Sequence, residues 1–366
     1  MLEFASHFTA IVLPLSYLYS RLAKAALVDS GLAAFARARH PSRATILTFH
    51  GLYDREDEVE GLEWYLHLPV DVFEGICSFL RDEFRVIQLS DLIEAQIRGA
   101  RLPDNAVVIT FDDGYKSNYE LAYPILRKFG LPATIHVATG FLGGDDILWF
   151  QRVDMALSRT QKPQLDLKIK GKLLSLRFAN RAQRLQSLSC LMPELKRLSD
   201  VELRREVDRL EAVLEVNKPQ VGDLPEHMRP MSWAMAREMS AGGQIEIGGH
   251  TVTHPILSRC DESTMRTEIV TCRDRIHDEL GKPPVCFAYP NGTAEDFTRE
   301  TMSMVQEAGF KAACSMIEAR VDEQTSVFRL PRHGTPFSCW WAHALVSGVF
   351  ETFQEWKSRF KMQPQT

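Results

Sequence analysis

Two adjacent carboxylates and a pair of histidines carry the clearest chemical signal in this sequence. Asp112 and Asp113 directly follow an apolar run, and His250 and His254, four residues apart, follow a second one. One carboxylate and two imidazoles are ligands that zinc-like cations accept. A second carboxylate beside such a cation can act as a base. Taken alone, the acidic pair is equally typical of an ordinary turn, and single histidines are usually structural.

Two further clusters follow apolar runs nearer the C-terminus. They read FAYPNG at 287–292 and LPRHG at 330–334. Proline and glycine at such places force turns, so each cluster on its own indicates only that a strand stops.

The elements that must position these residues alternate along the chain. Strand-like runs, short and apolar, lie at 45–49, 107–111, 133–139, 244–248, 285–289, 312–316 and 328–330. Helical patterns between them lie at 70–84, 117–129, 232–241, 261–280 and 298–308. Strands that alternate with helices predict a parallel sheet. Seven such units favour an α/β fold of the distorted (β/α)7 barrel type, one repeat short of the usual eight.

The four clusters follow predicted strands two, four, five and seven, and so share one face of the barrel. This carboxyl-end face is where catalytic groups converge in such barrels. Asp113, His250 and His254 would then bind a metal and leave positions open for water and substrate, as in a catalytic site. Asp112 would be free to take a proton from that water.

The regular spacing is interrupted once, between the third and fourth strands. Residues 160–217 are rich in leucine and in charged residues, in an alternation typical of exposed helices. A small hairpin is predicted at 165–178. We expect an N-terminal helical extension at 1–40, a barrel domain at 41–338 with a helical insertion at about 145–230, and a C-terminal helix at 339–366. The insertion is expected to shape a substrate groove or a partner surface.

Composition limits the classes of partner. A net charge of -5 argues against a large binding surface for nucleic acid. The seven cysteines are odd in number, scattered and without a CxxC pair. This usage indicates reduced thiols in a cytosolic chain and argues against a disulfide framework or a thiolate metal site.

Both ends of the chain contain apolar segments. Residues 8–19 form an apolar run that is too short to span a bilayer, is interrupted by Pro14 and is not preceded by Lys or Arg. We expect a helix that packs on the core or lies on a membrane surface, with a secretion signal as the weaker alternative. Residues 340–360 predict another amphipathic helix. The expected location is the cytoplasm, with inner-membrane association and export left open.

The motifs resemble those of the polysaccharide deacetylase family, the NodB-homology carbohydrate esterases, over about residues 43–336 without the insertion. TFDDGY at 110–115 resembles the family's first motif, and HTVTH at 250–254 resembles its second. The resemblance implies that Asp112 is the general base. It also implies that Asp113, His250 and His254 hold the metal.

The remaining motifs depart from the family pattern. FAYPNG resembles a third motif that normally reads Arg-x-Pro-x-Gly, but Ala288 occupies the arginine position, and Arg332 could fill that space from strand seven. The resemblance implies that the Asn291 backbone N–H helps to hold the oxyanion. It makes His333 the candidate general acid, although LPRHG differs from the usual Leu-x-His. The residues expected to contact substrate are Tyr115, Tyr289 and Pro290.

The expected function is therefore metal-dependent hydrolysis of N-acetyl groups on a carbohydrate: an exopolysaccharide, an oligosaccharide or a lipid-linked glycan. The expected cofactor is a divalent metal, Zn2+ first, with Co2+, Ni2+ or Mn2+ as alternatives. The expected partner is an N-acetylated glycan, with peripheral membrane contact through the termini and no nucleic acid. Alternatives are a deformylase or other amide hydrolase, and a non-catalytic carbohydrate-binding barrel. Substrate and oligomeric state stay open.

Overall fold

A curled parallel sheet forms the centre of the molecule. The computed structural model describes residues 31–54, 66–144 and 147–352. The strands follow the spatial order β1 (Thr45–Phe49), β5 (Ala106–Phe111), β6 (Ala133–Val137), β9 (Ile245–Gly249), β10 (Cys286–Ala288) and β11 (Ala312–Cys314). β4 (Arg85–Val86) pairs with the start of β5. β1, β5 and β6 are buried along their whole length. Burial on both faces explains why they read as continuous apolar runs.

An extended segment closes this sheet. The Leu330 N–H donates to Ala313, and the His333 N–H donates to Ile46, at 2.9 Å each. Residues 330–333 thus bridge β11 and β1, and the predicted barrel is confirmed. The boundaries of the predicted seventh strand were wrong, because 327–329 form a single 3-10 turn and the chain extends only from Leu330. Main-chain bonds to two neighbouring strands define this segment, and a local sequence pattern carries no such information.

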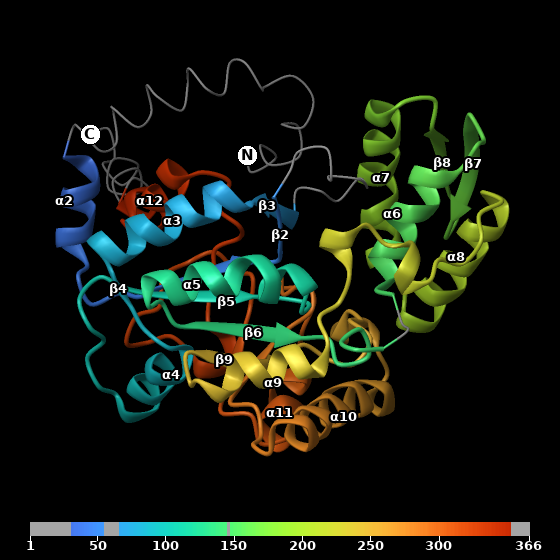
Figure 1. Ribbon diagram of the computed structural model, residues 1–366. Coiled ribbons are helices and arrows are strands. Elements are labelled where there is room, and N and C mark those ends of the chain that lie inside the picture. The colour runs from blue at the N-terminus through green and yellow to red at the C-terminus, as the bar shows by residue number, and fades with distance from the viewer. Residues whose placement is uncertain (1–30, 55–65, 145–146, 353–366) are drawn as a thin grey trace, which may run out of the picture.

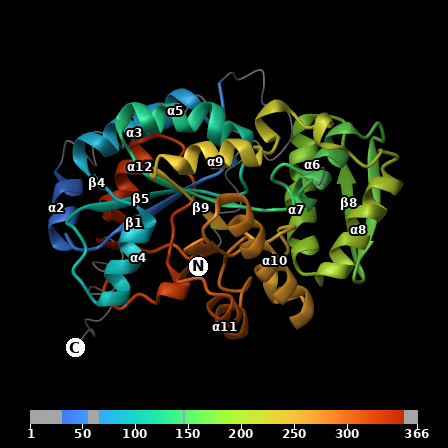
Figure 2. The same cartoon turned by 60° about the horizontal axis from the view of Figure 1, so that its bottom comes forward.

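Helices surround the sheet (Figures 1 and 2). They are α3 (Val70–Glu83), α4 (Leu89–Arg98), α5 (Tyr123–Phe129), α9 (Trp233–Ala241), α10 (Glu262–Leu280) and α11 (Arg299–Glu307). Short turns are the π-helical η4 (Asn118–Ala122) and the 3-10 turns η5 (Val221–Asp223), η6 (Glu226–Met228), η7 (Leu257–Arg259) and η8 (Val327–Arg329). The predicted helices between the strands are confirmed, except that the one before β6 begins with the π-helical turn.

The chain between β6 and β9 builds a second group of elements beside the barrel (Figure 1). It contains α6 (Trp149–Arg159), the antiparallel pair β7 (Gln164–Ile169) and β8 (Lys172–Arg177), α7 (Arg181–Lys196) and α8 (Asp200–Val213). The predicted hairpin is confirmed. Leucines of α7 and α8 pack with α6 in a hydrophobic cluster distinct from the one that α3, α5 and the central strands share.

Two helices flank the barrel at the ends of the described chain. α2 (Leu32–Arg39) lies before β1, and α12 (Cys339–Val346) packs on α3. A short parallel pair, β2 (Gly51–Tyr53) and β3 (His67–Pro69), follows β1. The apolar run at 8–19 lies outside the described residues, as does the C-terminal part of the helix predicted at 340–360. No helix in the described ranges is long and apolar enough to cross a membrane.

Candidate active site

Three side chains with metal-binding chemistry meet at the carboxyl ends of β5 and β9. The Nε2 atoms of His250 and His254 lie 3.6 and 3.5 Å from Asp113 Oδ1. Ligand atoms on a tetrahedral zinc, with bonds of about 2.0–2.2 Å, lie about 3.4 Å apart. The structure therefore brings together the three predicted ligands, with all ligand atoms within 4.8 Å of one another and both histidine–aspartate separations close to the spacing on a tetrahedral zinc.

Bonds to the surrounding backbone hold the histidines in place. The Nδ1 atom of His250 lies 2.7 Å from the carbonyl oxygen of Ala288, which leaves Nε2 directed toward Asp113. Glu268 of α10 accepts hydrogen bonds from the backbone N–H groups of Val252 and Thr253, at 2.8 and 2.9 Å, and from the Thr253 hydroxyl. Such bonds orient ligands before a metal arrives.

The charges at this cluster suit a cation. Burial lowers the pKa of His250 to about 4, and burial with His250 nearby holds that of His254 well below its usual range, so both imidazoles are neutral at pH 7. Burial and the neighbouring Asp112 raise the pKa of Asp113 to about 8. Asp113 Oδ1 is buried and has no hydrogen-bond partner among the described residues. A positive ion would satisfy that oxygen and favour its ionised form.

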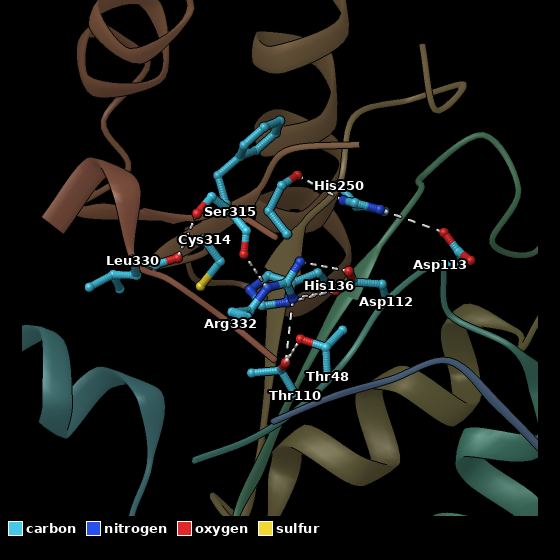
Figure 3. A network of polar contacts seen from close by, with 12 residues as sticks. Thr48, Thr110, Asp112, Asp113, His136, His250, Cys314, Ser315, Leu330 and Arg332 are labelled. Atoms are coloured by element: carbon cyan, nitrogen blue, oxygen red, sulfur yellow. Dashed lines mark hydrogen bonds and ion pairs between the residues drawn. The ribbon is translucent and has the colours of Figure 1, made fainter. Parts of the chain in front are cut away.

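Asp112 is held by a buried arginine. Arg332 donates to both carboxylate oxygens of Asp112, at 2.8 Å each, and its Nε donates to the Ser315 carbonyl at 3.2 Å (Figure 3). Burial alone would raise the pKa of Asp112, but the Arg332 guanidinium, with smaller contributions from His250 and His136, holds it well below its usual range. Arg332 thus binds Asp112, the residue that the sequence predicted it would orient.

His136 is a polar neighbour of Asp112 that sequence reasoning missed. It lies on β6, is fully buried, and has Nδ1 3.3 Å from Asp112 Oδ1. Burial lowers the pKa of His136, but the Asp112 carboxylate and Cys314 beside it outweigh this and raise it above the ordinary value. The sequence shows only a single histidine within an apolar strand. It does not indicate which residues of other strands that histidine would contact.

A cavity of about 230 Å³ opens over these residues. It is lined by His50, Leu66, Asp112, Asp113, Trp149, Phe150, Met192, Lys196, His250, His254, Tyr289, Asn291 and Met316. Of the residues predicted from the third motif, Tyr289 and Asn291 line it. The insertion contributes four wall residues that were not predicted: Trp149 and Phe150 from α6, and Met192 and Lys196 from α7. They were missed because they lie far along the chain from the motifs at 110–115 and 250–254.

Four predicted site residues are not among the described residues that line the cavity: Tyr115, Pro290, Arg332 and His333. Arg332 acts there only through its bonds to Asp112. Tyr115 is fully buried, and its proximity to Asp113 lowers the pKa of that carboxyl group, against the larger effect of burial. Tyr115 thus lies next to a predicted ligand and not on the cavity wall. Pro290 is buried in the turn between two lining residues. His333 directly follows Arg332 in an extended segment, so the two side chains point to opposite faces. Its charged neighbours are Glu318, Glu351 and Arg320. The position of His333 does not support the expected general acid.

Comparison with known proteins identifies relatives of one kind. The family model described as polysaccharide deacetylase matches residues 99–313. YxkH of Bacillus subtilis (strain 168), whose name places it among polysaccharide deacetylases, is 28% identical over 116 residues, which are 31% of this chain and 39% of YxkH. The poly-beta-1,6-N-acetyl-D-glucosamine N-deacetylase of Staphylococcus aureus (strain MSSA476) is 32% identical over 91 residues, 25% of this chain and 30% of that enzyme. The chain thus matches well under half of each relative's length.

A solved structure shares the fold. The Streptococcus pyogenes deacetylase PplD in complex with acetate superposes with a TM-score of 0.52 at 16% identity, covering 85% of this chain and 98% of that one. At this identity the likeness concerns the barrel architecture alone.

Proposed function

Because the chain belongs to the polysaccharide deacetylase family, whose model matches more than half of its residues, we propose that it hydrolyses N-acetyl groups on a glycan in a metal-dependent reaction. The observation that carries the proposal is the arrangement of Asp112. Its carboxylate is held by Arg332 directly beside the cluster of Asp113, His250 and His254, in the wall of one cavity. A base and a metal site are thus adjacent.

In this mechanism, Asp113, His250 and His254 would hold a divalent cation, Zn2+ being our first choice. When bound there, such an ion supplies Lewis acidity, which polarises the amide carbonyl and lowers the pKa of water at the site. Asp112 accepts the proton of the attacking water. Because Arg332 binds both of its oxygens, the carboxylate stays ionised and cannot rotate away from the cavity.

Two further steps use groups on the cavity wall. We assign the backbone N–H of Asn291 to the oxygen of the tetrahedral intermediate, a class of contact that contributes roughly 3–4 kcal/mol. Asn291 lines the cavity and follows Pro290 in a turn, where it has a positive φ of 57°. We assign proton return to the leaving amine to Asp112 itself, because His333 lies outside the cavity wall.

The size of the cavity supports a glycan that lies mostly outside it. At about 230 Å³ it is smaller than the pockets of roughly 300–1,000 Å³ that enclose drug-sized ligands. It therefore suits one acylated sugar, with neighbouring sugars of the chain outside it, next to the part of the wall that the insertion supplies. Since the Staphylococcus aureus relative is named for poly-beta-1,6-N-acetyl-D-glucosamine, we propose polymers of N-acetylglucosamine as the first substrate class to test.

A substrate panel tests this proposal. The chain is depleted of metal with a chelator, divided and restored with Zn2+, Co2+, Ni2+ or Mn2+, then incubated with N-acetylglucosamine oligomers and their N-formyl analogues. We expect acetate release only after metal restoration. Formate release without acetate release would contradict the assigned acyl group, and equal rates with and without metal would contradict the metal-dependent mechanism.

A further inference from the structure

A second group of potential ligands lies inside the barrel, apart from the cavity cluster. It consists of His136 on β6, Cys286 on β10 and Cys314 on β11, whose ligand atoms all lie within 4.8 Å of one another. All three are buried, with exposed fractions of 0%, 3% and 0%. The proposed mechanism uses neither cysteine.

We propose that His136, Cys286 and Cys314 form a second metal site that binds a thiophilic cation of the zinc class. The proposal does not rest on the proposed function, because none of the three side chains lines the cavity, although His136 also contacts Asp112. One imidazole and two thiolates form a ligand set that zinc accepts in proteins.

The distance between the sulfur atoms fits a shared ion. The two Sγ atoms lie 3.7 Å apart. Two thiolates on a tetrahedral zinc, each bonded at about 2.3 Å, lie about 3.8 Å apart. An ion could therefore bind both sulfurs with little movement of the strands.

The imidazole is placed to supply the third ligand. His136 pairs with Gly248 in the register of β6 and β9, and a Cβ atom at Gly248 would lie 2.5 Å from Cδ2 and 3.1 Å from Nε2 of the ring. Only glycine leaves room for this ring to pass over β9 toward the cysteines. Its Nδ1 faces Asp112. A histidine ligand whose other nitrogen faces a carboxylate is the usual arrangement at protein metal sites.

The hydrogen bonding and charge of the barrel interior favour occupation. Neither ring nitrogen of His136 makes a well-aligned hydrogen bond with a described residue, although Nδ1 lies 3.3 Å from Asp112 Oδ1, and a buried polar group without such a bond is destabilising. A divalent cation with two thiolates has no net charge, and Asp112 already balances Arg332. Binding would therefore satisfy the imidazole without adding an uncompensated charge to the core.

The absence of a CxxC pair argued against a thiolate metal site. The fold nevertheless brings together two cysteines that are far apart in the sequence. Cys286 and Cys314 are 28 residues apart and lie on neighbouring strands that a helix connects. No short spacing pattern describes such a pair.

Cobalt binding tests the proposal. Co2+ can replace zinc in proteins, and its absorption spectrum depends on the ligands that bind it. The full chain is produced in cobalt-supplemented medium, as wild type and with both His250→Ala and His254→Ala to remove the cavity site. We expect two cobalt ions in the wild type and one in the double variant, both with a sulfur-to-cobalt charge-transfer band in the near ultraviolet. Only a thiolate ligand produces this band, and the cavity cluster contains none.

Matched cysteine variants complete the test. Cys314→Ala should abolish the sulfur band and lower the wild-type cobalt content by one ion. Cys77→Ala, which removes an equally buried thiol on α3, should change neither. Circular dichroism verifies that each variant is folded. A wild type that binds one cobalt ion without a sulfur band would overturn the proposal, whatever the variants do.

Discussion

Asp112 is a buried anion whose charge one guanidinium balances. Two N–H···O bonds of 2.8 Å join Arg332 to it, and both side chains are almost fully buried. A buried ion pair contributes little net stability, but loss of one partner leaves an uncompensated charge at a cost of about 3–5 kcal/mol. The pair is therefore best understood as a device that fixes the orientation and ionisation of the carboxylate.

Replacement of Arg332 by lysine tests this role. Lysine keeps the charge but cannot donate to both oxygens at once. We expect Arg332→Lys to lower kcat about 10- to 100-fold with a smaller change in KM, measured as acetate release per folded molecule. The matched control is Arg320→Lys, since Arg320 is also buried and donates to Glu351 at 2.7 Å, away from the cavity. An equal loss in both variants would show that Arg332 acts only through stability.

The position of His333 predicts that this side chain is not the general acid. A general acid contributes typically 10²- to 10⁴-fold to the rate. Because the His333 side chain faces away from the cavity, we expect His333→Gln to keep kcat within about threefold of the wild type. A hundredfold loss of kcat at an unchanged melting temperature would restore His333 as the proton donor.

Sequence reasoning succeeded at the residue scale where motifs are contiguous. Asp112 and Asp113 are adjacent, and His250 and His254 lie within one turn, so their proximity was visible. The contacts of His136 depend on which strands lie beside β6 in the sheet. The outward direction of His333 depends on which side of its segment faces the barrel interior. A single sequence reveals neither.

At the scale of elements, the loop after β9 depends on α10 for its shape. Thr251 and His254 have positive φ values of 68° and 60°, and the Glu268 carboxylate holds the N–H groups between them. Without that carboxylate, backbone strain would favour other loop conformations.

We therefore expect Glu268→Ala to weaken metal affinity at the cavity site about 10- to 100-fold, the usual effect of removing a group that orients ligands. Competition with a chromogenic chelator measures this affinity. Cys314→Ala serves as the background for both proteins, so that only the cavity site is titrated. Glu262→Ala, an exposed acidic residue at the start of the same helix, is the control. Equal affinities in the two variants would contradict the role of Glu268.

Element type was predictable because β-branched runs alternate with helical periodicity. The segment that closes the barrel was misplaced, because residues 327–329 turn as a 3-10 helix and extension begins at Leu330. Pairing with β1, nearly three hundred residues earlier in the chain, decides that boundary, and local propensity has no access to it.

At the scale of the whole molecule, the insertion and the barrel share the cavity. A helical insertion was predicted at about 145–230, but not that its helices α6 and α7 would place Trp149 and Met192 on the wall. Which face of an inserted helix meets the barrel follows from tertiary packing. The proposed glycan must therefore pass between two parts of the fold.

Several buried histidines make the stability of the whole fold depend on pH. Burial lowers the pKa of His227, which lies outside the metal cluster, to about 4. An unfolded histidine titrates near about 6.5. Between these values the unfolded chain binds a proton that the folded chain does not, so stability is retained above the window and falls as pH drops through it.

We expect the free energy of unfolding of the chelated protein to decrease from pH 6.5 toward pH 4, and His227→Gln to make that decrease less steep. Urea unfolding at several pH values measures it. The same slope in both proteins would contradict the assignment of His227.

The proposed function depends above all on two assignments, Asp112 as the base and Asp113 as a metal ligand. Acetate release from N-acetylglucosamine oligomers, measured together with metal content for the wild type, Asp112→Asn and Asp113→Asn, tests them most directly. Cys314→Ala is again the background, so that the metal content reports the cavity site. We predict that Asp112→Asn keeps its metal and loses turnover by 10²-fold or more, about the contribution of a general base. Asp113→Asn should lose both. Acetate release by metal-loaded Asp112→Asn at close to the wild-type rate would show that Asp112 is not the base.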